Sequence, residues 1–155
     1  MKKIIYILAA AALLAACSEK ENPGNTNGGN EEEGGNIELT LEQQKLIGEW
    51  HSTTLAIDGD IYLHFAEDKT FDMYQQIKEG AHRLYRGTWD LAEGLLTGRY
   101  NDGEDWAASY HVEMNETTMT LVSDNDAAEQ SVFKKEPIPS EIKETCETVV
   151  KSAAL

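Results

Sequence analysis

Residues 61–77 read IYLHFAEDKTFDMYQQI, and this stretch indicates the fold class. Ile61, Leu63 and Phe65 stand at every second position, and the apolar residues that begin at Phe71 alternate in the same way. Alternation with a period of two places apolar side chains on one face of a β-strand. The letters EDK between the two halves have the polar composition of a tight turn. The stretch therefore predicts two neighbouring strands joined by a short connection.

The same pattern continues on both sides of this stretch. The candidate strands are Trp50–Ile57, Ile61–Phe65, Phe71–Ile77, Tyr85–Leu91, Leu96–Tyr100, Trp106–Met114, Met119–Leu121 and Ser131–Lys135. The breaks between them carry turn residues such as Asp58-Gly59, Glu93-Gly94 and Asn101-Asp102-Gly103. Closing such a sheet buries its apolar face and removes its exposed edges. We therefore expect an all-β fold, an eight-stranded up-and-down antiparallel barrel.

A short helix is expected before the first strand. Thr40, followed by Gln43 three residues later, forms a capping-box pattern, which predicts a helix over Leu41 to Leu46. Ordered structure should begin near Ile37, where apolar residues first recur. After Gly48 the apolar period changes from helical to alternating, so the helix leads directly into the barrel.

A second helix is expected after the barrel. Pro137 and Pro139 end the last strand because proline cannot donate to the ladder of strand hydrogen bonds. Ser140 can then cap a helix that runs to about Ser152. Its apolar positions have helical spacing and should pack on the barrel wall. These positions are Ile142, Cys146, Val149 and Ala153.

The N-terminus has the features of an export signal. Lys2 and Lys3 precede the apolar run Ile4 to Leu13, which is shorter than the roughly 20 residues of a membrane-spanning helix. The next residues, Leu14-Ala15-Ala16-Cys17, resemble a bacterial lipobox. We predict cleavage before Cys17 and attachment of a lipid to its thiol, giving an outer-membrane lipoprotein that faces the periplasm or the cell surface. The alternative is a soluble secreted protein in which Cys17 is incidental.

The residues after Cys17 predict a tether and a strongly acidic exported protein. Residues 18–36 read SEKENPGNTNGGNEEEGGN, a composition that cannot bury enough apolar surface to order itself. Loss of Lys2 and Lys3 with the signal peptide changes the formal net charge from −15 to −17. Such a charge disfavours nucleic acid and anionic lipid as partners, so the membrane should be held through the acyl anchor. The predicted domains are a signal peptide at 1–16, a lipidated cysteine and disordered acidic tether at 17–36, a barrel at 37–136, and a C-terminal helix at 137–155.

Three short motifs resemble a known family. Gly48-Glu49-Trp50 lies at the start of the first strand, FAEDKTF spans residues 65–71, and Gly87-Thr88-Trp89 follows in the fourth strand. Together with the order of helices and strands, they resemble the lipocalin-like group of the calycins, and in particular small lipocalin-like lipoproteins of Gram-negative anaerobes. The resemblance covers roughly residues 41–135. It implies a binding protein, and a Trp50 that plugs the closed end of the barrel.

The aromatic residues of the predicted inward face are the candidate ligand contacts. We single out Trp50, Tyr85, Trp89, Trp106 and Tyr110. They could line a pocket for a small apolar or amphipathic ligand, or the barrel could receive an envelope protein partner at its open end. In the alternative, these residues form the core themselves, and the protein is a structural, interaction or inhibitor protein with a filled barrel. A cavity of several hundred Å3 would favour the first hypothesis.

Other chemistry has little support in the sequence. The four histidines, His51, His64, His82 and His111, are scattered without the spacing of metal ligands, so no metal or other cofactor is expected. The chain has no Gly-x-Ser-x-Gly elbow, and its carboxylates fall in turns or at outward strand positions. An enzyme is therefore not expected.

The turns also predict how neighbouring strands align. A turn at Glu93-Gly94 places Trp89 opposite Gly98. If the next connection spans 101–105, Tyr100 faces Trp106, and Gly98 faces Ala108. The indole of Trp89 would then lie over two very small residues and occupy much of the interior at that level.

Overall fold

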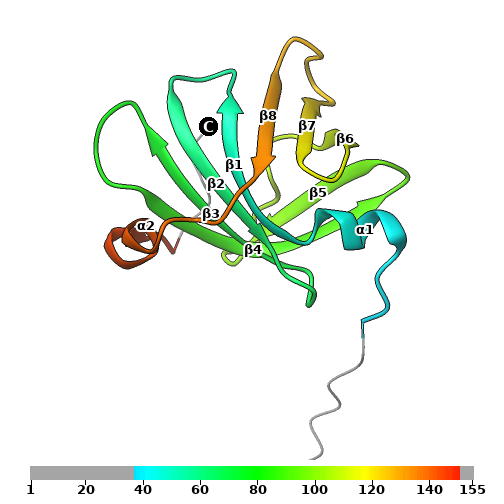
Figure 1. The fold of residues 1–155 in the computed structure, drawn as a ribbon, viewed down its shortest axis with the longest axis horizontal. Coiled ribbons are helices and arrows are strands. Elements are labelled where there is room, and N and C mark those ends of the chain that lie inside the picture. The colour runs from blue at the N-terminus through cyan, green and yellow to red at the C-terminus, as the bar shows by residue number, and fades with distance from the viewer. Residues whose placement is uncertain (1–36, 151–155) are drawn as a thin grey trace, which may run out of the picture. The chain divides into compact units, whose positions relative to one another are not determined.

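Eight antiparallel strands close into a barrel in this computed structural model, which describes residues 37–150 (Figure 1). The elements are α1 (Leu41–Leu46), β1 (Gly48–Thr54), β2 (Gly59–Phe65), β3 (Thr70–Ile77), β4 (Arg83–Ala92), β5 (Leu95–Tyr100), β6 (Tyr110–Met114), β7 (Thr118–Ser123), β8 (Gln130–Lys135), α2 (Ser140–Thr145) and β9 (Glu147–Thr148). Each strand from β1 to β7 pairs with the next along the chain, and β1 pairs with β8 to close the ring. The predicted all-β fold, with an up-and-down barrel and a helix on each side of it, is confirmed. The predicted signal peptide, Cys17 and tether lie outside the described residues, as does Ala153.

The hairpin read from residues 61–77 has the predicted register. Phe65 pairs with Phe71, and Leu63 pairs with Met73, so all four side chains lie on the inner face. The connection between them contains Lys69 at φ 62°, a left-handed conformation that closes the turn. Alternation of apolar residues thus decides which face of this hairpin meets the core.

Helix α1 has the predicted bounds and capping box. The Thr40 hydroxyl accepts from the Gln43 backbone N–H at 3.2 Å, and the Thr40 N–H donates to the Gln43 side chain at 3.0 Å. Gln43 is itself buried and donates through Nε2 to the Leu91 carbonyl at 2.9 Å. One glutamine therefore both caps the helix and attaches it to β4. Neither α1 nor α2, the two helices of residues 37–150, is long and apolar enough to cross a membrane.

The connection between β5 and β6 differs from the prediction. Trp89 does pair with Gly98, as expected, but β6 begins at Tyr110, which pairs with Leu96. The predicted pairs Tyr100–Trp106 and Gly98–Ala108 are therefore wrong.

The predicted alignment of β5 with β6 fails because the chain makes a tight loop after β5, and the residues that follow this loop leave the sheet before β6 begins. The Gly103 N–H donates to the Tyr100 carbonyl at 2.9 Å, and the Trp106 N–H donates to the Gly98 carbonyl at 2.8 Å. Residues 107–109 (Ala-Ala-Ser) favour strands weakly. Their carbonyls turn toward the β7–β8 loop instead: Ala107 accepts from the Asn125 side chain at 3.1 Å, and Ser109 accepts from the Asp124 N–H at 2.9 Å.

The C-terminal helix is shorter than predicted. It ends at Thr145, its N-cap is Pro139 rather than Ser140, and no side chain caps it. Cys146 is extended, and Glu147–Thr148 form β9, which pairs in parallel with Arg83–Leu84 of β4. That part of β4 has no partner in β5, so its free edge offers backbone hydrogen bonds that outcompete continuation of the helix.

Two apolar clusters result from this arrangement. The larger one fills the barrel interior and contains most of the buried aromatic residues. The smaller one lies on the outer face, where Tyr62, Tyr74 and Leu84 are covered by Ile138, with Ile142 and Cys146 packed against them. The predicted apolar positions Ile142 and Cys146 therefore pack on the barrel wall, Val149 packs against the larger cluster, and Cys146 is a half-buried packing residue.

Candidate functional site

The interior of the barrel is filled at the end near α1. Trp50 is fully buried and donates through its indole N–H to the Leu46 carbonyl at 2.8 Å. The Lys135 ammonium lies 5.0 Å from the centre of the Trp50 ring. Phe65 packs edge-on against Trp89, with ring centres 5.7 Å apart. These contacts fill the interior around Trp50 with packed side chains.

The opposite end contains a cavity of about 570 Å3. It lies toward the β1–β2 and β7–β8 loops, which are both at the upper end of the barrel in Figure 1. The wall comprises Leu55, Ala56, Ile57, Asp58, Ile61, Leu63, Met73, Gln75, Ile77, Lys78, Tyr100, Trp106, Tyr110, Leu121, Glu129, Ser131 and Phe133. Sites for small molecules usually span about 300–1,000 Å3. The size of this cavity therefore favours the ligand-binding hypothesis over the alternative of a filled barrel core, although the end near α1 is filled.

The five aromatic candidates divide between these two regions. Trp106 and Tyr110 line the cavity. Trp50 and Trp89 belong to the filled end, and Tyr85 is buried beside Tyr100 without reaching the cavity wall. A ligand in this cavity would not touch Trp50, Tyr85 or Trp89, and ligand contact by Trp106 and Tyr110 stays a prediction.

Two polar residues of the cavity wall, Gln75 and Tyr100, were not among the candidate ligand contacts predicted from the sequence. Gln75 occupies an inward position on β3 between Met73 and Ile77, and its side chain is 3% exposed. Tyr100, the last residue of β5, is also buried. A polar residue at an inward position between two apolar ones was the available signal for Gln75. Tyr100 gave no comparable signal because tyrosine is common in barrel cores.

The tyrosines at the cavity are neutral hydrogen-bonding groups. Burial raises the pKa of Tyr100 far above its ordinary value, and the neighbouring Tyr110 and Tyr85 add to this. Burial also raises the pKa of Tyr110, with a further contribution from Glu129. Both phenols therefore keep their proton at any physiological pH.

Buried side-chain donors without a hydrogen-bond partner border the cavity and a second recess of the barrel. Within residues 37–150 these atoms are Gln75 Nε2, Trp89 Nε1 and Trp106 Nε1. Gln75 and Trp106 line the cavity, while Trp89 and Trp106 border a second recess of about 390 Å3 between β4, β5 and the segment at 105–109. A buried donor left unpaired costs about 1–3 kcal/mol, so each of these groups favours an acceptor that the described residues do not supply.

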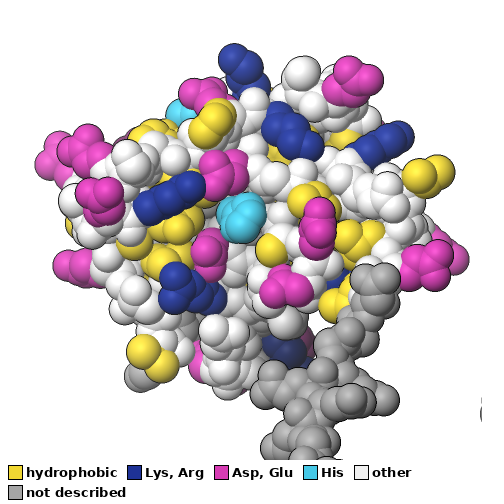
Figure 2. All heavy atoms as spheres, turned by 60° about the horizontal axis from the view of Figure 1, so that its bottom comes forward, with side chains coloured by type: hydrophobic (Ala, Val, Ile, Leu, Met, Phe, Trp, Pro, Cys, Tyr) yellow, Lys and Arg dark blue, Asp and Glu magenta, His cyan; other side chains and the backbone are white. Residues whose placement is uncertain are grey.

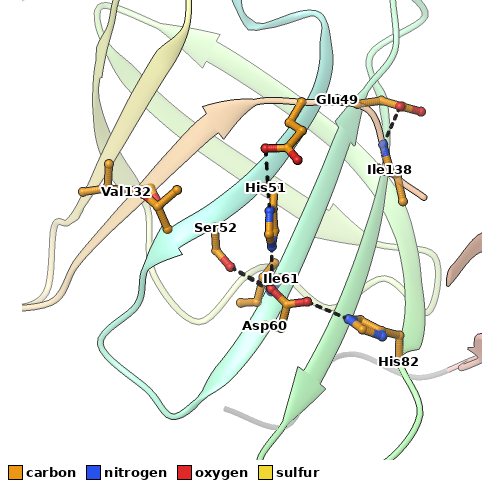
Figure 3. A network of polar contacts seen from close by, with 10 residues as sticks. Glu49, His51, Ser52, Asp60, Ile61, His82, Val132 and Ile138 are labelled. Carbon is orange, nitrogen blue, oxygen red and sulfur yellow. Dashed lines mark hydrogen bonds and ion pairs between the residues drawn. The ribbon is translucent and has the colours of Figure 1, made fainter.

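The histidines are less scattered than the sequence suggests. His51 and His82 both contact Asp60 on the outer face of the barrel, at 2.8 Å and 3.1 Å (Figure 3). The His51 ring also stacks on Tyr62, with ring centres 4.1 Å apart. Residues far apart in the sequence meet here because β1, β2 and the β3–β4 loop are neighbours, which spacing alone could not reveal.

This network does not have the geometry of a hydrolase or metal site. The Ser52 hydroxyl contacts Asp60 at 3.4 Å and accepts from the Ile61 N–H, whereas a catalytic triad places histidine between serine and aspartate. In the part of the chain that the structure describes, no group of three or more His, Cys, Asp or Glu side chains could hold a metal ion. The contacts instead join β1, β2 and the β3–β4 loop.

Comparisons with known proteins give two matches to family models. A model described as a lipocalin-like domain matches residues 19–121, which is more than half of the chain. A model of the prokaryotic membrane lipoprotein lipid attachment site matches residues 1–18. Among solved structures, the chain is similar to the NMR structure of a protein from Bacteroides uniformis ATCC 8492, with 19% identity, a TM-score of 0.48, and coverage of 61% of this chain and 93% of that chain. No curated protein matches the chain.

Proposed function

This chain belongs to the family of lipocalin-like domains and carries a lipoprotein lipid attachment site, and from this premise we propose that it binds a small apolar or amphipathic molecule while anchored in the cell envelope. The ligand lies in the cavity of about 570 Å3 near the β1–β2 and β7–β8 loops. The cavity is the single observation that carries the proposal, because its wall is mainly apolar and its size suits one small molecule.

The anchor in this proposal is a lipid on Cys17, at the end of the matched attachment site. The part of the chain from Cys17 onward has no strong attraction for an anionic membrane, since its formal net charge without Lys2 and Lys3 is −17. Figure 2 shows carboxylates spread over the face viewed from the α1 side, with lysine, arginine and small apolar areas between them. Attachment through acyl chains therefore explains membrane association better than surface charge does.

A neutral fluorescent probe tests the proposal. N-phenyl-1-naphthylamine, which fluoresces in apolar surroundings, is titrated into residues 17–155 of the chain, with Cys17→Ser so that no acyl chain competes. Saturable binding at one site per chain is expected. Ser131→Trp should abolish it, because Ser131 is a small residue on the cavity wall, opposite Leu121 on β7.

The neighbouring residue supplies a matched control. Gln130 is exposed and lies on the same strand, at an outward position. Gln130→Trp should leave probe binding unchanged. A folded Ser131→Trp protein that binds the probe as well as the parent would exclude this cavity as the site.

A further inference from the structure

Resting on the proposed function, we infer that the cavity selects an electrically neutral molecule with a hydrogen-bond-accepting oxygen, such as a ketone, ester or quinone carbonyl, over a fatty carboxylate. The inference depends on two features of the wall: its polar side chains within the strands are neutral and include a buried donor without a partner, and the charged groups at its edge are mainly acidic.

The first feature is a set of neutral polar side chains. The strands contribute Gln75, Tyr100, Tyr110 and Ser131 to the wall. Gln75 Nε2 is buried without a hydrogen-bond partner, and so is Nε1 of Trp106, which lies in the same wall. Both phenols stay protonated because burial raises their pKa values. A ligand oxygen that accepts from one of these donors would satisfy a group that the protein leaves unpaired.

The second feature is the distribution of charge. Asp58, Lys78 and Glu129 are the charged residues of the wall, and all three are exposed. Lys78 is therefore the single cation that lines the cavity among the described residues, and two carboxylates accompany it. A ligand carboxylate deep in the cavity would be desolvated with no cation beside it, which is far more costly than burying a carbonyl. At the mouth it would face two like charges.

The test compares ligands that differ only at the head group. Decan-2-one, decanoate and decylamine are each titrated as competitors of N-phenyl-1-naphthylamine for residues 17–155 with Cys17→Ser at pH 7. We expect decan-2-one to bind at least about tenfold more tightly than decanoate, because the anion loses its hydration without gaining a partner. Decanoate binding that equals or exceeds ketone binding overturns the inference, and so does preferential binding of decylamine.

Conservative variants identify the donors. Tyr100→Phe, Tyr110→Phe and Gln75→Met keep the shape of the wall and remove one donor each. At least one of them should lower the affinity for decan-2-one by about threefold to tenfold, which is the range for one neutral hydrogen bond. The affinity for the naphthylamine probe should change little. Tyr85→Phe is the matched control, because Tyr85 lies beside Tyr100, with ring centres 6.2 Å apart, but does not line the cavity.

The outcomes separate this inference from the proposed function. If the folded protein binds neither the naphthylamine probe nor any decyl compound, both the proposed function and the inference are wrong. If all the compounds bind but the ketone has no advantage, the cavity is a binding site and only the inference is wrong. Lys78→Ala adds a further check: loss of decanoate binding on this change would place a ligand carboxylate beside Lys78 and contradict the selectivity for neutral molecules.

Discussion

The Trp106 indole lies against Gly98, in the space that a Cβ atom on Gly98 would occupy. A backbone hydrogen bond of 2.8 Å from the Trp106 N–H to the Gly98 carbonyl holds the two residues together. Trp106 comes from the connection between β5 and β6, not from a strand, and it borders both the cavity and the second recess. A glycine in the barrel wall thus admits a loop tryptophan into the interior.

The first prediction follows from this contact. Gly98→Leu should lower the free energy of unfolding by about 1–3 kcal/mol, because the new side chain must displace the Trp106 ring from a packed interior. Urea denaturation measures the change. Thr97→Leu, at the neighbouring exposed position, is the control, and the cost at Gly98 should shrink in a Trp106→Ala background. A Gly98→Leu protein as stable as the parent would show that Trp106 is not fixed against this glycine.

The second prediction concerns the filled end of the barrel. Trp50→Ala should cost about 3–5 kcal/mol, since it empties a fully buried aromatic site and removes the hydrogen bond to the Leu46 carbonyl. Leu41→Ala on α1 should have little effect because Leu41 is 77% exposed. Thermal and urea unfolding compare the two variants. Similar small losses for both would contradict the role of Trp50 as the plug of this end.

The third prediction concerns the acid side of the stability profile. Burial acts to raise the pKa of Glu49, but hydrogen bonds from Lys143 at 2.7 Å and from the Ile138 N–H at 2.8 Å outweigh it, so the pKa is lowered on balance. Stability from Glu49 is therefore fully present above the pKa of the unfolded chain and is lost as the pH falls through the lower pKa of the folded protein.

Unfolding measured from about pH 6 to about pH 3 checks this expectation. The stability advantage of the parent over Glu49→Gln should shrink as the pH falls through that interval. Glu113→Gln, which removes an exposed carboxylate from β6, controls for the change in net charge. An advantage that stays constant with pH would mean that the contacts of Glu49 do not depend on its ionisation.

Local patterns predicted most of this fold, and the failures have physical causes. Alternation located the hairpin at residues 61–77, and Thr40 with Gln43 located α1. The alignment of β5 with β6 was wrong because the three residues after Trp106 leave the sheet, and their path depends on contacts with the distant β7–β8 loop. Helix α2 was too long in the prediction because the free edge of β4 competes for the backbone after Cys146.

The candidate site was harder to predict than the fold. The sequence identifies Trp106 and Tyr110 as inward aromatic residues. It does not show that they line a cavity while Trp50 and Trp89 lie in the packed core, because this depends on how all the strands pack in three dimensions. The volume of the cavity results from side chains on six strands and four connections between strands, and no single segment encodes it. The alternation rule did not identify Gln75 because it selects apolar residues, and Gln75 is a polar residue at an inward position of β3.

The fourth prediction concerns the anchor. Cys17→Ala should release the protein from the membrane fraction, because the matched attachment site would lose the thiol that carries the lipid. Fractionation after a high-salt wash, followed by immunoblotting, measures the distribution. A salt wash that releases the parent as well would indicate an electrostatic attachment. Retention of Cys17→Ala would mean that a lipid on this thiol is not what holds the protein.

The central claim, that the cavity holds a small molecule, is tested most directly by native mass spectrometry of the protein purified from its own host. The account predicts a non-covalent mass on the parent and on Gln130→Trp, and its loss from folded Ser131→Trp, in which the cavity is filled. A parent protein that carries no such mass, or a bound mass that persists in Ser131→Trp, would contradict the account.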